Sequence, residues 1–378
     1  MHRTVALLQQ RGHETRVFTS EDVPGHRRTA LSYISSRKAC KALLNALNES
    51  KPGAVHLHNF YHELSPGILS VLDPKRRPRG MRVVMTAHDA HLVCPNSGLC
   101  TFDRGVRRVI SPDDARTVRS LLRHRWDHRG AAHSWLKLAQ HVWNFRLRDR
   151  RGAIDCVICP SRFMQRCMEF AGRPTALLPH PVSVTPLAAE SRSASRSTRS
   201  SALQLVFAGR VDPEKGIANF LQALSPEFPG RLIIIGDGSD LSRCREIVTQ
   251  RGMHKQVQFA GRFPHHETIR IFAQSQVLIL PSLVPENCPL SLLEALAVGT
   301  NILATDLGGS AEIIEQARTG FLFKSGDAPS LRNALNEIAA AQESGTLNAF
   351  EASPFLALRS EDAYVDQLLR LYDAGAAS

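Results

Sequence analysis

Two cationic residues that follow an apolar segment give this sequence its clearest chemistry. Residues 203–208 have the pattern of a strand, and Gly209, Arg210 and Lys215 come after it. A glycine lets a ligand approach the backbone, while an arginine fork and a lysine point charge suit an anion. When a bond between a sugar and a diphosphate breaks, charge collects on the diphosphate, so fixed cations stabilise the transition state. The pattern indicates a diphosphate site, and the alternative is a surface loop with ordinary charges.

A second group of residues surrounds a predicted helix start. Good helix formers follow Pro289, which places Glu286 in the preceding loop and Glu294 within the first two turns of the helix. Free amides at a helix start suit a phosphate, and a carboxylate accepts hydrogen bonds from paired hydroxyls, as on ribose or a hexose. Glutamates near a helix start also interact favourably with its dipole, which is the structural alternative. The candidate binding residues of this group are Glu286, Asn287, Cys288, Pro289, Leu290 and Glu294.

Two further segments are candidates for contact with a ligand. Gly236 and Asp237 end an apolar run with a glycine turn, which fits close approach of a nucleotide, although such turns are common between a strand and a helix. His88 follows the strand-like residues 82–86 and could bond a transferred sugar or handle a proton. A structural histidine is the alternative at that position.

The second half of the chain alternates strand-like and helical patterns. The strand-like runs are residues 203–208, 232–235, 257–259, 277–280, 302–304 and 320–323. Such alternation predicts a mostly parallel sheet wrapped by helices, in which ligands bind outside the carboxyl ends of the strands.

The first half shows the same alternation less regularly. Its strand candidates are residues 15–19, 54–58, 82–86, 156–159 and 176–178. A doubly wound domain normally opens with a strand and a glycine turn, whereas Val5 to His13 has the pattern of a helix end closed by Gly12. We therefore expect the first domain to be incomplete at its start, without the opening strand and its loop.

Length and composition limit the class of protein. A chain of 378 residues favours two domains. A hydrophobic content of 43% and a charged content of 22% are ordinary for a soluble protein, and no apolar run approaches the roughly 20 residues of a membrane span. The N-terminus lacks the apolar core and cleavage site of a secretory signal, so we expect a cytoplasmic protein.

The cysteines do not predict a metal site or a disulfide framework. The chain has eight, many of them inside apolar runs, which favours reduced and buried thiols. Cys156 and Cys159 on one strand would point to opposite faces and could not hold one metal together. Cys94 and Cys100 flank a turn and could meet, but no further ligands complete a zinc set nearby.

The net charge of +12 is concentrated in one stretch, residues 104–151. Leucines and tryptophans interleave with its arginines, which gives the stretch an amphipathic helical character. This pattern suits an anionic membrane surface or a lipid-linked phosphate acceptor, and a solvated basic helix over the domain core is the alternative. We expect no nucleic-acid partner, because no groove-reading or RNA-stacking motif accompanies the charge.

Taken together, these motifs resemble the family-4 retaining glycosyltransferases, which have the two-lobed GT-B fold. The resemblance runs through nearly the whole chain and is most specific in the second half. It is carried there by Phe207 to Arg210 with Lys215 and Gly216, by Gly236 to Gly238, by Phe259 to Gly261, and by Glu286 with Glu294. In the first half it is carried by His56 to Asn59, Thr86 to Asp89, Val93 to Asn96 and Pro160 to Phe163. His180 departs from the pattern, because the family usually has asparagine there.

The resemblance implies an α/β chain with two Rossmann-like, doubly wound lobes facing a cleft. It implies an acceptor-side domain over residues 1–184, a linker over 185–201, a donor-binding domain over 202–355, and a terminal helix within 356–378 that packs back on the first lobe. In this view Arg210 and Lys215 hold the donor diphosphate, and Glu294 bonds the ribose. Glu286 bonds the transferred sugar, His88 lies beside that sugar, and the amides of residues 287–290 approach the phosphate.

The function implied is metal-independent transfer of a hexose-type sugar, with retention of configuration, from a UDP- or GDP-sugar donor. The acceptor is a hydroxyl of a glycan or a lipid-linked intermediate, and the basic stretch would attach the protein peripherally to the inner face of the membrane. Two alternatives are a noncatalytic nucleotide-sugar-binding relative, motivated by the missing opening strand, and a GT-B epimerase. The pairing of Glu286 with Glu294 favours transfer over epimerisation.

Overall fold

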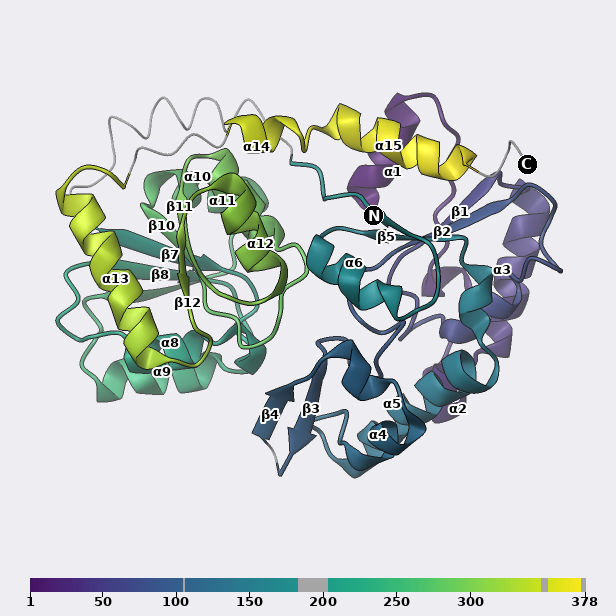
Figure 1. Cartoon of the computed structure of the whole chain (residues 1–378), viewed down its shortest axis with the longest axis horizontal. Helices are drawn as coiled ribbons and strands as arrows, with labels where there is room; N and C mark the ends of the chain where they lie inside the picture. Colours follow the sequence, from purple (N-terminus) through teal and green to yellow (C-terminus); the bar gives the residue numbers. More distant parts are fainter. Residues whose placement is uncertain (105, 183–202, 348–352, 375–378) are drawn as a thin grey trace. The chain divides into compact units, whose positions relative to one another are not determined.

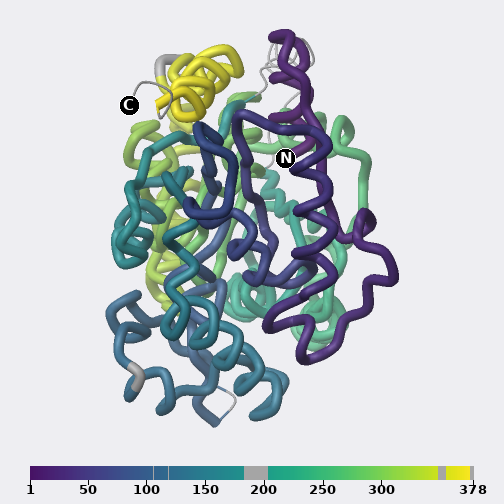
Figure 2. Tube along the Cα trace, turned by 90° about the vertical axis from the view of Figure 1, so that its right-hand side faces the viewer, coloured from purple at the N-terminus to yellow at the C-terminus, as the bar shows by residue number. Residues whose placement is uncertain are grey.

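The protein is described here by a computed structural model that covers residues 1–104, 106–182, 203–347 and 353–374 (Figure 1). Figure 2 follows the same trace by colour from the N-terminus to the C-terminus. The chain divides into two compact units, the first formed by Met1–Pro179 with Asp362–Ser378 and the second by His180–Glu361. The linker predicted over 185–201 lies outside the described residues.

Unit 1 is built on a four-stranded parallel sheet. Its strand order is β1 (Ala54–Leu57), β2 (Arg82–Thr86), β5 (Cys156–Cys159) and β6 (Thr175–Leu177). These strands confirm four of the five predicted in the first half. The surrounding α-helices are α1 (His2–Gln10), α2 (Ala30–Ile34), α3 (Arg37–Ser50), α4 (Val118–Arg123), α5 (Ala131–His141) and α6 (Arg162–Glu169). Shorter helical turns are η1 (Ser20–Asp22), η2 (Pro66–Ser70), η3 (Pro112–Ala115), η4 (Val142–Leu147) and η5 (Arg150–Ala153).

The two faces of this sheet are buried by different helices. Cys159 packs in the main core with residues of α3 and α6, while Cys156 packs in a second cluster with Leu7 of α1 and Leu368 of α15 (Glu361–Asp373). Figure 1 shows α15 beside α1. Arg11 also pairs with Asp362 and Asp366 of α15 at 2.8 and 3.0 Å. The predicted terminal helix is thus present, and the opposite orientation of the two cysteines is confirmed.

The strand predicted over residues 15–19 is wrong. These residues have extended or irregular backbone without strand pairing, and the sheet has β1 at its edge. An apolar alternating pattern makes a strand only where a neighbouring strand supplies hydrogen-bond partners. The sequence pattern at 15–19 is present, but the described structure gives it no such neighbour.

The long connection between β2 and β5 contains a hairpin that was not predicted, followed by helices in the stretch 104–151 for which helical character was predicted. β3 (Cys100–Asp103) and β4 (Val106–Val109) form an antiparallel hairpin, and α4, α5 and η4 follow it. Trp126 is fully buried under this segment, with its Nε1 donating to the carbonyl oxygen of Leu121 at 2.9 Å. Much of the basic stretch is therefore a folded part of unit 1.

Unit 2 is built on a six-stranded parallel sheet. Its strand order is β12 (Phe321–Phe323), β11 (Asn301–Thr305), β10 (Val277–Leu280), β7 (Gln204–Ala208), β8 (Arg231–Ile235) and β9 (Val257–Gly261). All six strands match the predicted runs. The helices are η6 (Pro213–Lys215), α8 (Ile217–Ala223), α9 (Leu241–Gln250), α10 (His265–Gln274), α11 (Leu290–Ala297), α12 (Gly308–Ala317), α13 (Ala328–Glu343) and α14 (Ser353–Ala357).

Strand alternation divides the core of unit 2 into two layers. Leu205 and Phe207 of β7 face the cluster that includes α8, α9 and α13, which lie together in Figure 1. Val206 faces the cluster that includes α10, α11 and α12. Since successive strand residues point to opposite faces, one apolar strand can be buried on both sides. The α/β class with parallel sheets is confirmed.

The strand order of unit 2 contains a reversal between β7 and β10. The chain proceeds from β7 to β8 and β9 on one side, then returns to β10, β11 and β12 on the other. In open α/β sheets, the loops at such a reversal diverge and leave a crevice at the carboxyl ends of the strands. The loops after β7 and β10 carry the predicted cations and Glu286.

A buried histidine makes the stability of unit 1 sensitive to pH. Burial, together with the nearby charges of Arg146 and Arg151, lowers the pKa of His141, at the end of α5, to about 3. The folded state therefore keeps this ring neutral, whereas the unfolded chain protonates it below about pH 6.5. The stabilisation is complete above that pH and declines as the pH falls towards the folded pKa.

We predict that the free energy of unfolding falls as the pH is lowered from 7 to 5. In His141→Leu the slope of this free energy against pH should be smaller, by the equivalent of about one bound proton. One proton corresponds to at most about 1.4 kcal/mol per pH unit. His133→Leu, at an exposed position of the same helix, is the control and should leave the slope unchanged. Urea unfolding at several pH values measures the slope, and an equal slope in wild type and His141→Leu would contradict the prediction.

Candidate functional site

The centre of the candidate site is an ion pair between the two loops at the strand reversal. Nζ of Lys215, after β7, lies 2.7 Å from Oε1 of Glu286, after β10. The hydroxyl of Ser282 donates to the same carboxylate oxygen at 2.5 Å. Both charged side chains are largely buried, with 21% and 16% of their surface exposed. Lys215, the residue predicted to bind the diphosphate, and Glu286, the residue predicted to bind the sugar, are therefore in direct contact.

The backbone holds these two loops together as well. The amide of Leu283 donates to the carbonyl oxygen of Glu214 at 2.8 Å. Gly216 packs so tightly that a Cβ there would overlap the carbonyl oxygen of Pro281. The loop carrying Lys215 is thus docked on the segment that leads to Glu286, and the ion pair does not depend on side-chain reach alone.

Arg210 is the more exposed cation of the site. Its guanidinium pairs with Asp212 and lies 3.4 Å from Oε1 of Glu214. Asp212 also accepts hydrogen bonds from the amide and the hydroxyl of Ser239, at 3.0 and 2.9 Å. Burial alone would raise the pKa of Asp212, but the bonds from Ser239 and the charges of Arg210 and Lys215 lower it below its ordinary value. Asp212 therefore links the predicted diphosphate loop to the turn after β8.

The glycine turn after β8 lies directly against the loop after β7. The amide of Gly209 donates to Ile235 at 3.0 Å, and the amide of Val211 donates to Asp237 at 3.0 Å. Gly236 has φ +135°, and a Cβ at this position would overlap the carbonyl oxygen of Gly209. Only glycine meets both requirements, which explains its place in the predicted motif.

The loop before α11 is shaped by the start of α12. Glu286 forms an isolated parallel bridge with Gly308, and the amide of Gly309 donates to the carbonyl oxygen of Glu286 at 2.6 Å. A Cβ on Gly309 would overlap the carbonyl oxygen of Asn287. The Gly308-Gly309 pair therefore sets the backbone path of the residues that precede the helix.

The helix start predicted at Pro289 is confirmed, because α11 begins at Leu290 with Pro289 as its N-cap. No side-chain hydrogen bond caps this end. Burial raises the pKa of the Cys288 thiol to about 11, so the thiol is neutral beside the helix start. Leu290 is 53% exposed. The amides of Leu292 and Leu293 donate to the carbonyl oxygen of Pro289 at 3.2 and 3.4 Å, and the positive end of the helix dipole lies at Leu290.

Glu294 has a partner that the sequence analysis missed. Nε2 of His265, the first residue of α10, lies 2.9 Å from Oε1 of Glu294. The histidine is exposed and the glutamate is 30% exposed. His265 comes shortly after the quoted motif Phe259 to Gly261, but no spacing rule in the sequence connected it with Glu294. Ser282, Gly308 and Gly309 were also missed, because their contacts with the loop of Glu286 depend on the path of the backbone.

In unit 1, His88 belongs to a group of histidines at the carboxyl ends of β1 and β2. Its Nε2 lies 2.8 Å from Nδ1 of His58. Next to this pair, His56 bonds Tyr372 of α15 at 2.8 Å and Thr86 at 2.7 Å. Burial lowers the pKa of His88 below its ordinary value and lowers that of His56 to about 3. His88 is therefore a neutral, hydrogen-bonded imidazole near pH 7.

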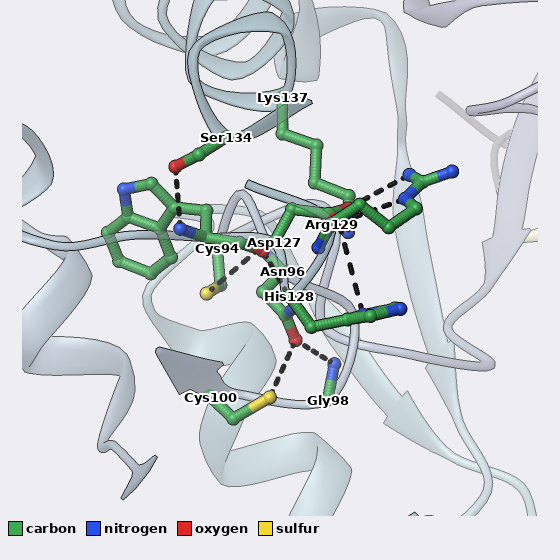
Figure 3. Close-up of polar contacts among 10 residues, drawn as sticks. Cys94, Asn96, Gly98, Cys100, Asp127, His128, Arg129, Ser134 and Lys137 are labelled. Carbon is green, nitrogen blue, oxygen red and sulfur yellow. Dashed lines mark hydrogen bonds and ion pairs between the residues drawn. The ribbon is translucent and has the colours of Figure 1, made fainter. Parts of the chain in front are cut away.

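The loop after His88 is fixed by the polar contacts in Figure 3. The amide group of Asn96 donates to the carbonyl oxygen of Trp126 at 3.0 Å and accepts from the thiol of Cys100 at 3.2 Å. The carboxylate of Asp127 is 2% exposed and pairs with Arg129 and Lys137 at 2.9 and 3.0 Å. Cys94 and Cys100 are free thiols. In the described part of the chain, no group of three or more His, Cys, Asp and Glu residues could hold a metal ion.

The structure therefore groups the predicted donor residues within unit 2. Gly209, Arg210, Lys215, Gly236 and Asp237 lie on the adjoining loops after β7 and β8. Residues 286–290 meet them through Lys215, and Glu294 lies further along α11 beside His265. The roles assigned to these residues stay predictions.

Comparisons with known proteins give the class. Residues 190–347 match the family model of glycosyl transferases, group 1. The fold is that of solved GT-B glycosyltransferases: sucrose-phosphate synthase from Thermosynechococcus elongatus superposes with a TM-score of 0.65 at 21% identity, over 90% of this chain and 78% of that one. HepE of Anabaena, solved with UDP and glucose, superposes with a TM-score of 0.63 at 17% identity, over 97% and 88%.

Residues 190–347 thus carry the sequence pattern of the group 1 glycosyltransferases, which confirms the coarser resemblance to glycosyltransferases for this part of the chain. A D-inositol 3-phosphate glycosyltransferase from Corynebacterium urealyticum is 30% identical over 183 residues, 46% of this chain and 43% of that protein. An exopolysaccharide phosphotransferase from Streptomyces coelicolor is 36% identical over 139 residues, 35% of this chain and 14% of that protein. The matched parts span less than half of either relative. The finer assignment to family 4 stays a prediction.

We predict that Gly236→Ala destabilises the protein by at least about 2 kcal/mol more than Gly252→Ala. Both glycines have positive φ, but a Cβ at 236 would overlap the backbone of Gly209, whereas a Cβ at 252 would have nothing within 4 Å. Thermal and urea unfolding of the two variants measure the difference. Equal losses would show that the close approach of the two loops is not required.

Proposed function

We propose that the protein transfers a hexose-type sugar from a nucleoside-diphosphate sugar, with retention of configuration, to a hydroxyl of a glycan or a lipid-linked acceptor. The observation that carries the proposal is the Lys215–Glu286 ion pair at the strand reversal of unit 2. It brings a cation suited to a diphosphate into contact with a carboxylate suited to sugar hydroxyls. The group 1 glycosyltransferase pattern over residues 190–347 supports the same chemistry.

The departing diphosphate is assigned to the two cations and the helix start. Arg210 is 68% exposed and can turn from its acidic neighbours towards a ligand, whereas Lys215 is held in place by its loop. The uncapped amides at the start of α11 add positive potential without another side chain. Charge that develops on the diphosphate is thus met by groups fixed before the reaction, so no metal ion is required in this proposal.

The sugar and the ribose are assigned to the two glutamates. Glu286 is held by Ser282 and Lys215, so its carboxylate is oriented to accept hydrogen bonds from the transferred sugar. Glu294 would accept from the paired hydroxyls of ribose, with His265 fixing one of its oxygens. The donor is a UDP- or GDP-sugar; HepE, a structural neighbour, is solved with UDP-glucose.

The role of His88 is proposed from its chemistry. A neutral imidazole can accept or donate one hydrogen bond to a sugar hydroxyl without adding charge near the reacting carbon. Its contact with His58 fixes the ring, and burial keeps the ring neutral. His88 is thus proposed to bond the transferred sugar, with the leaving phosphate assisting removal of the acceptor proton.

We predict that Lys215→Ala lowers kcat/KM by about 10²–10³-fold, because it removes a cation at the developing charge. Glu294→Ala should weaken donor binding by about 10–100-fold through the loss of charged hydrogen bonds. Lys255→Ala and Glu337→Gln change exposed residues of the same unit and should match wild type. The measurements are turnover with a panel of UDP- and GDP-sugars and donor binding by calorimetry.

The outcomes separate the proposed enzyme from its alternatives. Donor binding by the wild type that Lys215→Ala and Glu294→Ala weaken, without turnover on any acceptor, would favour a noncatalytic nucleotide-sugar-binding protein. Conversion of the free donor sugar into its epimer would favour an epimerase. Unchanged donor binding in both variants would overturn the assignment of this site.

We also propose peripheral attachment to an anionic membrane surface through the basic segment 104–151. Trp135 of α5 and Leu147 of η4 are 58% and 70% exposed. Trp143, spaced between them along the same continuous helix, is 38% exposed and stacks with Arg148, whose guanidinium lies 4.4 Å from the ring centroid. Exposed tryptophan and leucine among arginines are typical of surfaces that insert at an anionic interface. None of the described helices has both the length and the apolarity to cross a membrane.

We predict that the protein associates with vesicles of phosphatidylcholine and phosphatidylglycerol at low salt and is released as salt is raised. The double variant Trp135→Ser, Leu147→Ser should reduce the association by about tenfold, because it removes apolar surface available for insertion. Leu31→Ser, at an apolar position that is 80% exposed, is the matched control. Absence of association at low salt, or equal loss in the control, would contradict the proposal.

A further inference from the structure

A cavity in unit 1 is lined by four arginines and belongs to no part of the site described above. Its volume is about 260 Å³. The lining comes from the loop after β2, from η3 and the residue after it, from η4, η5 and the turn between them, and from the segment between α6 and β6. The lining residues are Val93, Pro112, Arg116, Arg146, Asp149, Arg151, Phe170, Ala171, Gly172 and Arg173.

Part of the wall of this cavity lies away from the histidine group of unit 1, while Val93 belongs to the loop that follows His88. Gly172 and Arg173 precede β6, and Nε of Arg173 donates at 2.7 Å to the carbonyl oxygen of Ile154, which precedes β5. His88 instead follows β2. Because β2, β5 and β6 are parallel, residues that precede a strand and residues that follow one lie at opposite edges of the sheet. Part of the cavity wall is therefore built at the edge opposite His88.

Three of the four arginines are fixed by the backbone. Besides Arg173, Nη2 of Arg146 donates to the carbonyl oxygen of Ala115 at 2.9 Å, and Nη2 of Arg151 donates to that of Phe145 at 2.6 Å. The side chain of Arg151 is 13% exposed. Guanidinium groups held in this way lose little side-chain entropy when they bind a ligand, so the cavity is preorganised.

The positive charge of the cavity is only partly balanced. Among its lining residues the acidic one is Asp149, whose carboxylate accepts from Nε of Arg151 at 2.9 Å. Arg116 lies 3.7 Å from Asp113 outside the lining. Within the described residues, Nε of Arg146 is buried and has no hydrogen-bond partner. Burial lowers the pKa of Arg146, and repulsion from Arg151 and Arg116 lowers it further. Buried donors with surplus like charge are costly unless an anion binds them.

We propose that this cavity binds a phosphorylated ligand through a phosphomonoester or diphosphate group. Guanidinium forks match the geometry and charge of phosphate oxygens, and several of them converge here. The volume is slightly below the roughly 300–1,000 Å³ of pockets that enclose whole drug-sized molecules, so the cavity suits a phosphate group with a small attached moiety. The ligand is either a soluble phosphorylated compound or the headgroup of a phospholipid, since both present the same chemistry.

The experiment titrates inorganic pyrophosphate into the full chain by calorimetry, in wild type and in Lys215→Ala. Lys215→Ala lacks a cation of the donor site, so pyrophosphate that still binds to this variant is bound outside the donor site. We expect Asp149→Asn to tighten the cavity's affinity by about threefold to tenfold, because it removes its opposing charge. Asparagine tolerates the left-handed backbone of this residue, whose φ is +37°. A variant that merely fails to fold could not produce tighter binding.

The matched loss-of-charge variants are Arg116→Gln and Arg108→Gln. Arg116 is 71% exposed and lies 3.7 Å from Asp113, while Arg108 is 69% exposed and lies 3.5 Å from Asp103, outside the cavity. Arg116→Gln should weaken pyrophosphate binding by about threefold, as expected for one exposed charge, and Arg108→Gln should leave it unchanged. Equal effects of the two substitutions would indicate a general charge effect and overturn the proposal.

A second arm separates the two sources of the ligand. Flotation with phosphatidylcholine vesicles, with and without phosphatidic acid, presents the phosphomonoester as a headgroup. If Asp149→Asn tightens and Arg116→Gln weakens the binding of free pyrophosphate, the cavity is assigned to a soluble ligand. If these two substitutions change only the association with vesicles that contain phosphatidic acid, the cavity is assigned to a headgroup. The proposal is overturned if neither arm shows binding, or if neither Asp149→Asn nor Arg116→Gln changes the affinity. Either result leaves the assignment of the donor site untouched.

Discussion

The ion pair between Lys215 and Glu286 is the interaction on which the candidate site depends. A pair this buried loses hydration that its attraction must offset, so it persists only where both loops are held in register. The pairing of β7 with β10 places the loops side by side, and the backbone contact from Leu283 to Glu214 fixes their spacing. Removing one partner would leave the other as an uncompensated charge. The two opposite charges therefore balance each other at the centre of the candidate site.

Backbone close approach extends this centre to the rest of unit 2. The turn at Gly236 lies against Gly209, and the start of α12 lies against the loop that carries Glu286. Neither contact tolerates a side chain. The connections after β7, β8, β10 and β11, four in all, thus meet at the carboxyl ends of adjacent strands, as the reversal in strand order requires.

Unit 1 uses buried polar groups differently. Burial lowers the pKa of His88 and of His56, so these two rings are neutral near pH 7 and add hydrogen-bonding capacity without charge. The arginines around the cavity keep their charge and are held by backbone carbonyls instead. A neutral cluster and a cationic cavity thus lie within one unit, and the parallel sheet places part of the cavity wall at the edge opposite the histidines.

The sequence by itself determined most of the strands and the helix start at Pro289, because apolar runs and helix-start residues act locally. It also led to one wrong strand, residues 15–19, since a strand needs a neighbour that a local pattern does not reveal. The contact of Lys215 with Glu286 was decided by the tertiary structure. The contact of His265 with Glu294, the packing of Gly309 on Asn287 and the convergence of Arg116, Arg146, Arg151 and Arg173 were decided only by the tertiary structure. The physical reason is that these contacts join residues far apart in the chain, through backbone paths that no spacing rule encodes.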